Sequence, residues 1–197
     1  MKPLNLNETA ERYIYEDYAS WDDDNRYELI DGVVYMMSPA PSQEHQRIIV
    51  EIAAQLWVFL KGKPCKVFAA PFDVCLNAAG DKDKTVVQPD IVVVCDKSKL
   101  DGKRCNGAPD MAVEILSPST SKKDKVLKFD KYREAGVREY WIVDPEDKTI
   151  HVYILRDGEY IVKAYGITEE VTTTEIPVHV LEGCLINIRD VFAEENS

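Results

Sequence analysis

Two apolar runs near the middle of the chain each carry one carboxylate, and they constrain the fold more than any other feature. The runs are Pro89–Val94 (PDIVVV) and Met111–Leu116 (MAVEIL). Apolar runs of this length, bounded by Pro, Asp and Ser, are typical of strands, and their nearly continuous apolar character predicts burial on both faces. An ionised carboxylate costs roughly several kcal/mol to bury unless it is paired, hydrogen-bonded or bound to a metal. Glu114 therefore needs a partner, which a second carboxylate and a divalent cation would supply.

The elements predicted around these strands form an α/β core. The clearest helix is Ser42–Leu60, in which apolar residues recur every three or four positions until Gly62 and Pro64 end it. A second helix is expected at Thr120–Ala135, with Gly136 where a left-handed cap is required. Further predicted elements are a short helix near Thr9–Ala19, a hairpin at Tyr27–Tyr35, and strands at Lys66–Leu76, Pro89–Cys95, Met111–Leu116 and Glu139–Pro145.

Short strands and turns are predicted after Pro145. The strands are expected at Thr149–Arg156, Tyr160–Tyr165 and Val178–Leu181, and Asp-Gly at 157–158 predicts a hairpin between the first two. No repeat or linker divides the 197 residues. We therefore expect a single domain with an N-terminal arm at 1–25, a core at 26–145 and a C-terminal β extension at 146–192.

Composition narrows the class of protein. An apolar fraction of 45% and a charged fraction of 30% are typical of soluble globular proteins, and the longest apolar runs are too short to span a bilayer. The N-terminus has no basic, apolar leader, so a cytoplasmic location is expected. Five cysteines without a CxxC pair and three scattered histidines give no zinc signature, and they favour free thiols over a redox role.

The charge of the chain is acidic overall but uneven. A net charge of −11 argues against a protein that binds nucleic acid over its whole surface. Lysines and arginines nevertheless concentrate at 97–104 and 122–133. This pattern leaves open either a local basic face on an acidic body or ordinary solvated lysines.

Asp90 and Glu114 are the first candidates for a metal site. Asp90 opens its strand directly after a proline and so lies at a sheet end, where the sites of α/β proteins gather. If the two strands are neighbours, both carboxylates can face one cation, and such oxygen donors suit Mg²⁺ or Mn²⁺. The alternative is that Asp90 caps a turn and Glu114 forms a structural ion pair.

Four further residues are candidates for the same site. Lys128 borders the packed face of its predicted helix, from which its ammonium could stabilise charge on a phosphate, although most helix lysines are solvated. His45 continues the buried stripe of its helix and is more often a core histidine than a ligand. Glu28 lies early in a hairpin, where it could pair with a basic residue instead, and Asp73 interrupts an apolar strand.

A set of motifs lies between Arg26 and Pro145, and the most specific are LSPST at 116–120 and AGVxEYW at 135–141. The others are YELIDG at 27–32, MSP at 37–39, His45, Pro89-Asp90, Lys128, Tyr132 and Val143-Asp144. Together these segments resemble the Uma family of putative restriction endonucleases, within the PD-(D/E)XK nuclease superfamily.

The resemblance implies a fold and an activity. The fold is a restriction-endonuclease-like core, an α/β mixed central sheet flanked by helices, with extra N-terminal and C-terminal β-hairpins. The activity is metal-dependent hydrolysis of phosphodiester bonds in DNA by an endonuclease. In it Asp90 and Glu114, with the carbonyl of Ile115, hold Mg²⁺ or Mn²⁺ and activate water. Nucleases of this fold commonly dimerise, so a homodimer is also implied.

The lysine departs from the superfamily pattern. The superfamily lysine is expected two residues after the second acid, where this chain has Leu116. In this family the lysine lies in the following helix, and Lys128 is the position that matches it. Asp124 matches a recurrent acid of the family and could orient Lys128. Two other hypotheses therefore stay open. One is a catalytically weak or inactive nuclease-fold protein that binds nucleic acid or acts as an accessory, and the other is hydrolysis of another phosphate ester. The choices between DNA and RNA and between single and double strands also stay open.

Overall fold

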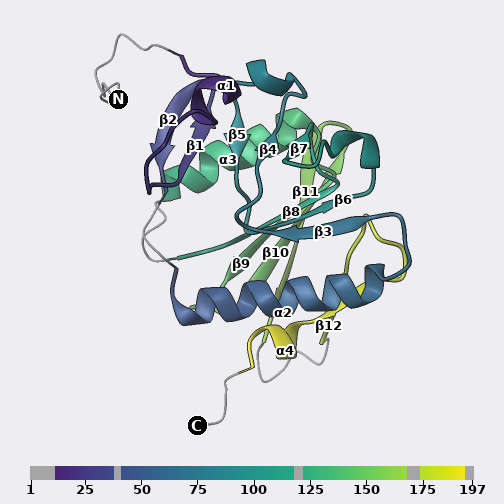
Figure 1. Ribbon diagram of the computed structural model, residues 1–197. Helices are drawn as coiled ribbons and strands as arrows, with labels where there is room; N and C mark the ends of the chain where they lie inside the picture. The colour runs from purple at the N-terminus through teal and green to yellow at the C-terminus, as the bar shows by residue number, and fades with distance from the viewer. Residues whose placement is uncertain (1–11, 38–40, 118–121, 168–173, 194–197) are drawn as a thin grey trace.

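The computed structural model describes residues 12–37, 41–117, 122–167 and 174–193, and only the backbone of 122–126. Its centre is a six-stranded sheet in the order β11-β10-β9-β8-β6-β3 (Figure 1). These strands are β3 (Lys66–Ala69), β6 (Ile91–Val94), β8 (Met111–Ile115), β9 (Glu139–Asp144), β10 (Thr149–Arg156) and β11 (Glu159–Gly166). The sheet is mixed because β8 and β9 run parallel, whereas the other neighbours are antiparallel.

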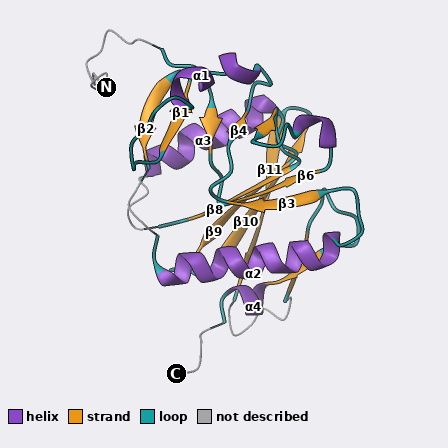
Figure 2. Ribbon diagram, in the orientation of Figure 1, coloured by secondary structure: helices purple, strands orange, loops and turns teal. Residues whose placement is uncertain are grey.

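Two long helices cover opposite faces of this sheet, α2 (Gln43–Leu60) on one side and α3 (Lys122–Ala135) on the other (Figures 1 and 2). Successive side chains of a strand point to opposite faces. Accordingly, Ile91 and Val93 pack in the core beneath α2, while Val92 and Val94 pack with Tyr132 of α3. The parity of a strand position therefore decides which helix its side chain meets.

A second, smaller sheet in the order β2-β1-β5-β4-β7 lies beside α3 (Figure 1). Its strands are β1 (Tyr27–Ile30), β2 (Val33–Met36), β4 (Val74–Cys75), β5 (Val86–Val87) and β7 (Cys105–Asn106). Asp31 and Gly32 join β1 to β2 with φ values of 52° and 80°, the left-handed conformation that tight hairpins use. This hairpin brings the carboxylates of β1 and its turn toward α3, where Lys131 lies 3.1 Å from Asp31.

Short elements complete the fold. They are α1 (Tyr15–Tyr18), η1 (Gly80–Lys82), η2 (Lys97–Lys99), the paired strands β12 (Glu175–Pro177) and β13 (Leu185–Asn187), and α4 (Ile188–Val191). The last of these packs under α2 (Figure 1). Within the described ranges, none of the helices has the length and apolar character needed to cross a membrane.

The predicted α/β architecture is confirmed, including both flanking helices and the two Asp-Gly hairpins. Three predicted elements are wrong in detail. The strand expected at Lys66–Leu76 is two strands in different sheets, because Pro71 has no N–H to donate to a ladder. Residues 178–184 form tight turns rather than a strand, and the N-terminal helix covers only Tyr15–Tyr18, with residues 1–11 outside the description.

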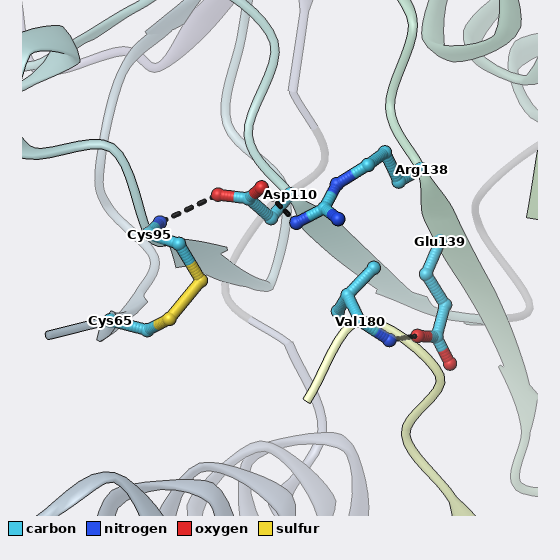
Figure 3. Close-up of a disulfide and its surroundings, with 6 residues drawn as sticks. All are labelled: Cys65, Cys95, Asp110, Arg138, Glu139 and Val180. Carbon is cyan, nitrogen blue, oxygen red and sulfur yellow. Dashed lines mark hydrogen bonds and ion pairs between the residues drawn. A yellow bond between two sulfur atoms is a disulfide. The ribbon is translucent and has the colours of Figure 1, made fainter. Parts of the chain in front are cut away.

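The free-thiol prediction is wrong for two cysteines. Cys65 and Cys95 form a disulfide (Figure 3). The register that pairs Lys66 with Val94 sets these cysteines opposite each other, one residue beyond the paired strands. Cysteine spacing alone could not show this, because the pairing depends on the β3–β6 register. The remaining cysteines, Cys75, Cys105 and Cys184, are buried and free.

Candidate active site

Asp90 and Glu114 meet at one end of the central sheet. The antiparallel register that pairs Ile91 with Val113 continues to set Asp90 opposite Glu114. Asp90 accepts a 2.7 Å hydrogen bond from the N–H of Ile115 to Oδ2. Both carboxylate side chains are nearly buried, with exposed fractions of 17% and 16%. The two acids that interrupt the apolar runs therefore lie on adjacent strands.

Helix α3 supplies two donors to Glu114. The side chain of Glu114 points to the α3 face of β8, because Met111, Val113 and Ile115 take the α2 face. There Oε1 of Glu114 accepts from Lys128 Nζ at 3.0 Å and from the Tyr132 hydroxyl at 2.7 Å. Lys128 and Tyr132 are four residues apart and so lie on one side of their helix.

Glu28 is the second partner of Lys128. Its Oε1 lies 2.7 Å from Lys128 Nζ, and it also accepts a 2.8 Å hydrogen bond from the N–H of Gln88. The exposed fractions of the two side chains are 8% for Glu28 and 12% for Lys128. The ammonium is thus held between a carboxylate of β1 and a carboxylate of β8, which joins the two sheets through α3.

The electrostatics of this cluster follow from burial and close charges. Burial raises the pKa of Glu114 to about 7; Lys128 and the Tyr132 hydrogen bond oppose the rise, and the carboxylates of Asp90 and Glu28 add to it. Burial lowers the pKa of Lys128, but the two carboxylates outweigh burial and raise it overall. The lysine therefore stays cationic, while Glu114 titrates near neutral pH.

His45 reaches the same point from α2. Ser42 caps this helix by accepting from the N–H of His45, which lies in the first turn. His45 Nε2 lies 3.1 Å from the carbonyl oxygen of Ile115 and 3.4 Å from Asp90 Oδ2. Burial lowers the pKa of His45, but its hydrogen bond and charge contact with Asp90 raise it overall. Its Nδ1 is buried and has no hydrogen-bond partner among the described residues.

Of the remaining residues predicted from the sequence, one lies in the cluster and one does not. Glu28, predicted as an accessory or as the partner of a basic residue, lies in the cluster and holds Lys128. Asp73 does not contact the cluster's acids or lysine; its Oδ1 accepts from the Tyr18 hydroxyl and from Gln88 Nε2, at 3.0 and 2.8 Å. The side chain of Asp124 lies outside the described residues.

Sequence reasoning missed two contacts at this site. It treated Tyr132 as a packing residue, although a hydroxyl one turn beyond Lys128 on a packed helix face requires a polar partner. It also missed that Glu28 and Lys128 pair directly. That contact joins positions 100 residues apart, so no local pattern encodes it.

The oxygen atoms at this end of β8 suit a hard divalent cation. Asp90 Oδ2 and the carbonyl oxygen of Ile115 converge on one neighbour, His45 Nε2, and the carboxylate of Glu114 is adjacent. Over the described part of the chain, no group of three or more His, Cys, Asp or Glu side chains is arranged to hold a metal ion. The fit to a cation such as Mg²⁺ rests on donor chemistry alone, because carboxylate and carbonyl oxygens are the donors that Mg²⁺ takes, and it binds few carboxylates and keeps several waters.

Fold and site together define an α/β protein with a restriction-endonuclease-like core, whose acids and lysine gather at the end of two central strands. Residues 15–188 match the model of the Uma2 family, described as "Putative restriction endonuclease", and the chain belongs to that family. It is 26% identical over 165 residues to the uncharacterized protein slr1290 of Synechocystis, covering 82% of this chain and 84% of that protein.

A solved structure supports the fold. The crystal structure of a putative nuclease belonging to DUF820 from Anabaena variabilis superposes with a TM-score of 0.70 at 20% sequence identity. The match covers 91% of this chain and 97% of that one. At this identity the likeness establishes the shared fold, and the family match indicates a nuclease-like function.

Proposed function

We propose that this protein is a metal-dependent endonuclease that hydrolyses phosphodiester bonds in DNA. The observation that carries the proposal is the convergence of Asp90, Glu114 and Lys128 at the end of β8, in a chain of the Uma2 family. Two acids beside one cationic side chain match the needs of phosphoryl transfer, in which a phosphate must be positioned and its developing charge neutralised.

Each residue has a distinct proposed role. Asp90, Glu114 and the carbonyl of Ile115 would hold Mg²⁺ or Mn²⁺, and His45 Nε2 lies beside the oxygens of Asp90 and Ile115. When bound, the cation supplies Lewis-acid stabilisation of the phosphate and lowers the pKa of a bound water. Lys128 keeps Glu114 oriented through its 3.0 Å contact and places a fixed positive charge beside the phosphate.

Glu28 and Tyr132 act on these residues rather than on substrate. Glu28 limits the positions that the Lys128 ammonium can take, because its Oε1 lies 2.7 Å from Nζ while Glu114 Oε1 lies 3.0 Å from the same atom. The Tyr132 hydroxyl fixes Oε1 of Glu114 with a second hydrogen bond. Both contacts are short and nearly buried, so they preorganise the cluster before substrate arrives.

A second candidate is a nuclease-fold protein with weak or no catalysis that binds nucleic acid or serves as an accessory. One observation favours it: the ammonium of Lys128 is already shared by Glu28 and Glu114. A lysine neutralised by two carboxylates has less charge to offer a phosphate. A Lys128→Ala variant that loses metal-dependent turnover would remove this candidate.

The test compares cleavage of supercoiled and single-stranded DNA by the protein and by Asp90→Ala, with Mg²⁺, Mn²⁺ or EDTA. Asp73→Asn is the control, because the Asp73 carboxylate, among the described residues, accepts hydrogen bonds from Tyr18 and Gln88 and does not contact the acids or the lysine of the cluster. Cutting that needs metal, disappears in Asp90→Ala and persists in Asp73→Asn would support the nuclease.

A binding measurement covers the case in which no tested DNA is cut. Mn²⁺ titration by calorimetry or electron paramagnetic resonance should detect a site that Asp90→Ala and Glu114→Ala each weaken. Equal Mn²⁺ affinity and equal cleavage in all variants would overturn the assignment of these acids.

A further inference from the structure

The outer face of α2 carries apolar side chains that the sheet does not cover. Val50 and Val58 are 65% and 67% exposed, and Trp57, next to Val58, is 57% exposed. Positions 50, 54, 57 and 58 lie on one side of the helix, opposite the buried stripe that packs on the sheet. An exposed apolar patch of this kind indicates an interaction surface.

A basic turn continues this face beyond the C-terminal end of α2. The stretch 52–72 contains three lysines, Lys61, Lys63 and Lys66, and no acid, in a chain with 35 acids. All three lysines are exposed. The salt bridges among the described residues use other bases, namely His45, Arg104, Lys128, Lys131, Arg133 and Arg138. The turn is therefore a local patch of positive charge on an acidic protein.

The basic turn is tied to the central sheet. Cys65, two residues after Lys63, forms the disulfide with Cys95 (Figure 3). Asp96 follows Cys95, so the disulfide brings this acid toward the turn. Its Oδ1, however, accepts from the N–H and the hydroxyl of Ser98 at 2.9 and 2.7 Å, and it forms no salt bridge with a described lysine. The lysines thus lie on an anchored segment and stay available to an external anion.

Two of these lysines lie over aromatic rings. Lys61 Nζ lies 5.5 Å from the centroid of the Trp57 ring, and Lys63 Nζ lies 3.0 Å from that of Phe59. Such contacts hold an ammonium beside a ring. Phe59 packs against the core, whereas Trp57 is mostly exposed. Trp57 and Lys61 therefore present a flat apolar ring and a positive charge side by side.

We propose that this outer face of α2 binds a single-stranded segment of DNA, with a base stacked on Trp57 and phosphates beside the lysines of the turn. Exposed aromatic rings among positive side chains bind single strands without sequence preference, because every base has a face that can stack. In a duplex the bases stack on one another and do not reach the ring. A protein partner would also cover apolar side chains, but three lysines outside any described salt bridge fit a polyanion better. The choice of DNA rests on the proposed nuclease function.

The helix connects this surface to the candidate active site. His45 lies in the first turn of α2 and Trp57 in its last turn (Figure 1). At a rise of about 1.5 Å per residue, the two positions are about 18 Å apart along the axis. At ~3.4 Å per nucleotide this distance corresponds to about five nucleotides. A strand of about ten nucleotides is therefore long enough to contact Trp57 and the candidate active site together.

The fluorescence of Trp57 provides a direct test. Of the three tryptophans, Trp141 is fully buried and Trp21 is partly buried, so Trp57 is the one open to a stacking base. A single-stranded oligonucleotide of about ten nucleotides should quench this emission. The same oligonucleotide annealed to its complement should quench it far less. The titration is done in EDTA, so its result does not depend on cleavage or on the proposed metal site.

Variants separate stacking from charge. Measured by the anisotropy of a labelled strand, Trp57→Leu should weaken binding about tenfold, while Trp57→Phe, which keeps a ring, should retain most of the affinity. Lys61→Gln should reduce the slope of log Kd against log salt by about 0.7, the contribution of one phosphate contact on a single strand. Lys103→Gln is the matched control, because Lys103 is an exposed lysine before β7, in the smaller sheet, and should leave the slope unchanged.

Each result bears on this inference separately from the nuclease. Equal affinity of wild type and a folded Trp57→Leu protein would overturn it and would leave the face as a surface for a protein partner. Equal effects of Lys61→Gln and Lys103→Gln, or binding of inorganic polyphosphate as tight as that of the oligonucleotide, would reduce it to general attraction of anions. If no DNA is cut but quenching depends on Trp57, the binding surface stands and the proposed nuclease fails.

Discussion

Glu114 and Glu139 look alike in the sequence but differ in the structure. Each is a carboxylate in a mostly apolar strand, and β8 and β9, which carry them, are parallel neighbours. Burial raises the pKa of both carboxyls. They lie at opposite ends of the strands, since Glu139 opens β9 and Glu114 is the penultimate residue of β8.

The partners of the two carboxylates are different in kind. Glu139 is fully buried and accepts a 2.8 Å hydrogen bond from Trp141 Nε1. It also accepts one from the N–H of Val180, likewise at 2.8 Å (Figure 3). These donors are neutral and fixed, and they tie the C-terminal region to the sheet. Glu114 instead meets a cation, with Asp90 and Glu28 nearby. A buried acid with neutral donors is structural, whereas an acid in a cluster of charges indicates a site.

The largest expected effect is on DNA cleavage, which should depend on Glu114 and not on Glu139. Glu114→Gln should lower metal-dependent DNA cleavage by about a hundredfold or more, because the carboxylate charge is removed from the cluster. Glu139→Gln should retain cleavage, because its side chain lies at the other end of the strands. Steady-state cleavage, with circular dichroism to verify folding, measures both. A folded Glu139→Gln protein that has lost cleavage would break the comparison.

The free energy of unfolding, in contrast to activity, should depend strongly on Glu139. Glu139→Ala leaves the buried donors of Trp141 and Val180 without an acceptor, so the free energy of unfolding should fall by about 1–3 kcal/mol. Urea denaturation measures the change. Glu182→Ala, at an exposed glutamate in the same C-terminal region, is the control and should have little effect. Equal stability of the two variants would mean that Glu139 does not anchor this region.

The pH dependence of stability should carry the signature of Glu114. Its pKa is raised from an ordinary 4.5 to about 7, so the native state binds more protons than the unfolded state between these values. The free energy of unfolding contributed by this group therefore falls as pH rises from 4.5 to 7. Glu114→Gln should flatten that slope in urea titrations with EDTA, whereas the control Glu134→Gln, at a 58% exposed side chain, should keep it. A slope that is unchanged in Glu114→Gln would contradict the raised pKa.

Local patterns predicted the parts of the fold that local physics determines. The hairpin at Asp31 and Gly32 follows from residues that tolerate positive φ, and α2 follows from its cap at Ser42 and its apolar period. The acids of the candidate site were visible because a carboxylate in an apolar strand is costly. The same rule did not single out Glu139, because a sequence does not reveal whether the compensating donors are neutral or charged.

Contacts between distant segments were beyond prediction from pattern. The disulfide between Cys65 and Cys95 depends on the register of two strands, and the Glu28–Lys128 pair depends on how the hairpin docks against α3. Each is fixed by tertiary packing rather than by spacing along the chain. The sequence indicates Glu28 as an accessory residue of the site or as the partner of a basic residue, and the structure identifies that partner as Lys128.

The smallest effect concerns the hydroxyl of Tyr132. Tyr132→Phe removes one of the two donors to Glu114 Oε1 and should lower the free energy of unfolding by about 1 kcal/mol. This hydrogen bond lowers the pKa of Glu114, so its loss should raise that pKa further and move the acidic limb of the cleavage profile to higher pH.

Tyr160→Phe is the matched control, because the Tyr160 hydroxyl donates to the carbonyl of Val137 at 2.8 Å and not to the cluster. It should cost similar stability and leave the pH profile in place. If both variants left the profile in place, Tyr132 would be a packing residue, and the distinction between Glu114 and Glu139 would rest on Lys128 and the neighbouring carboxylates alone.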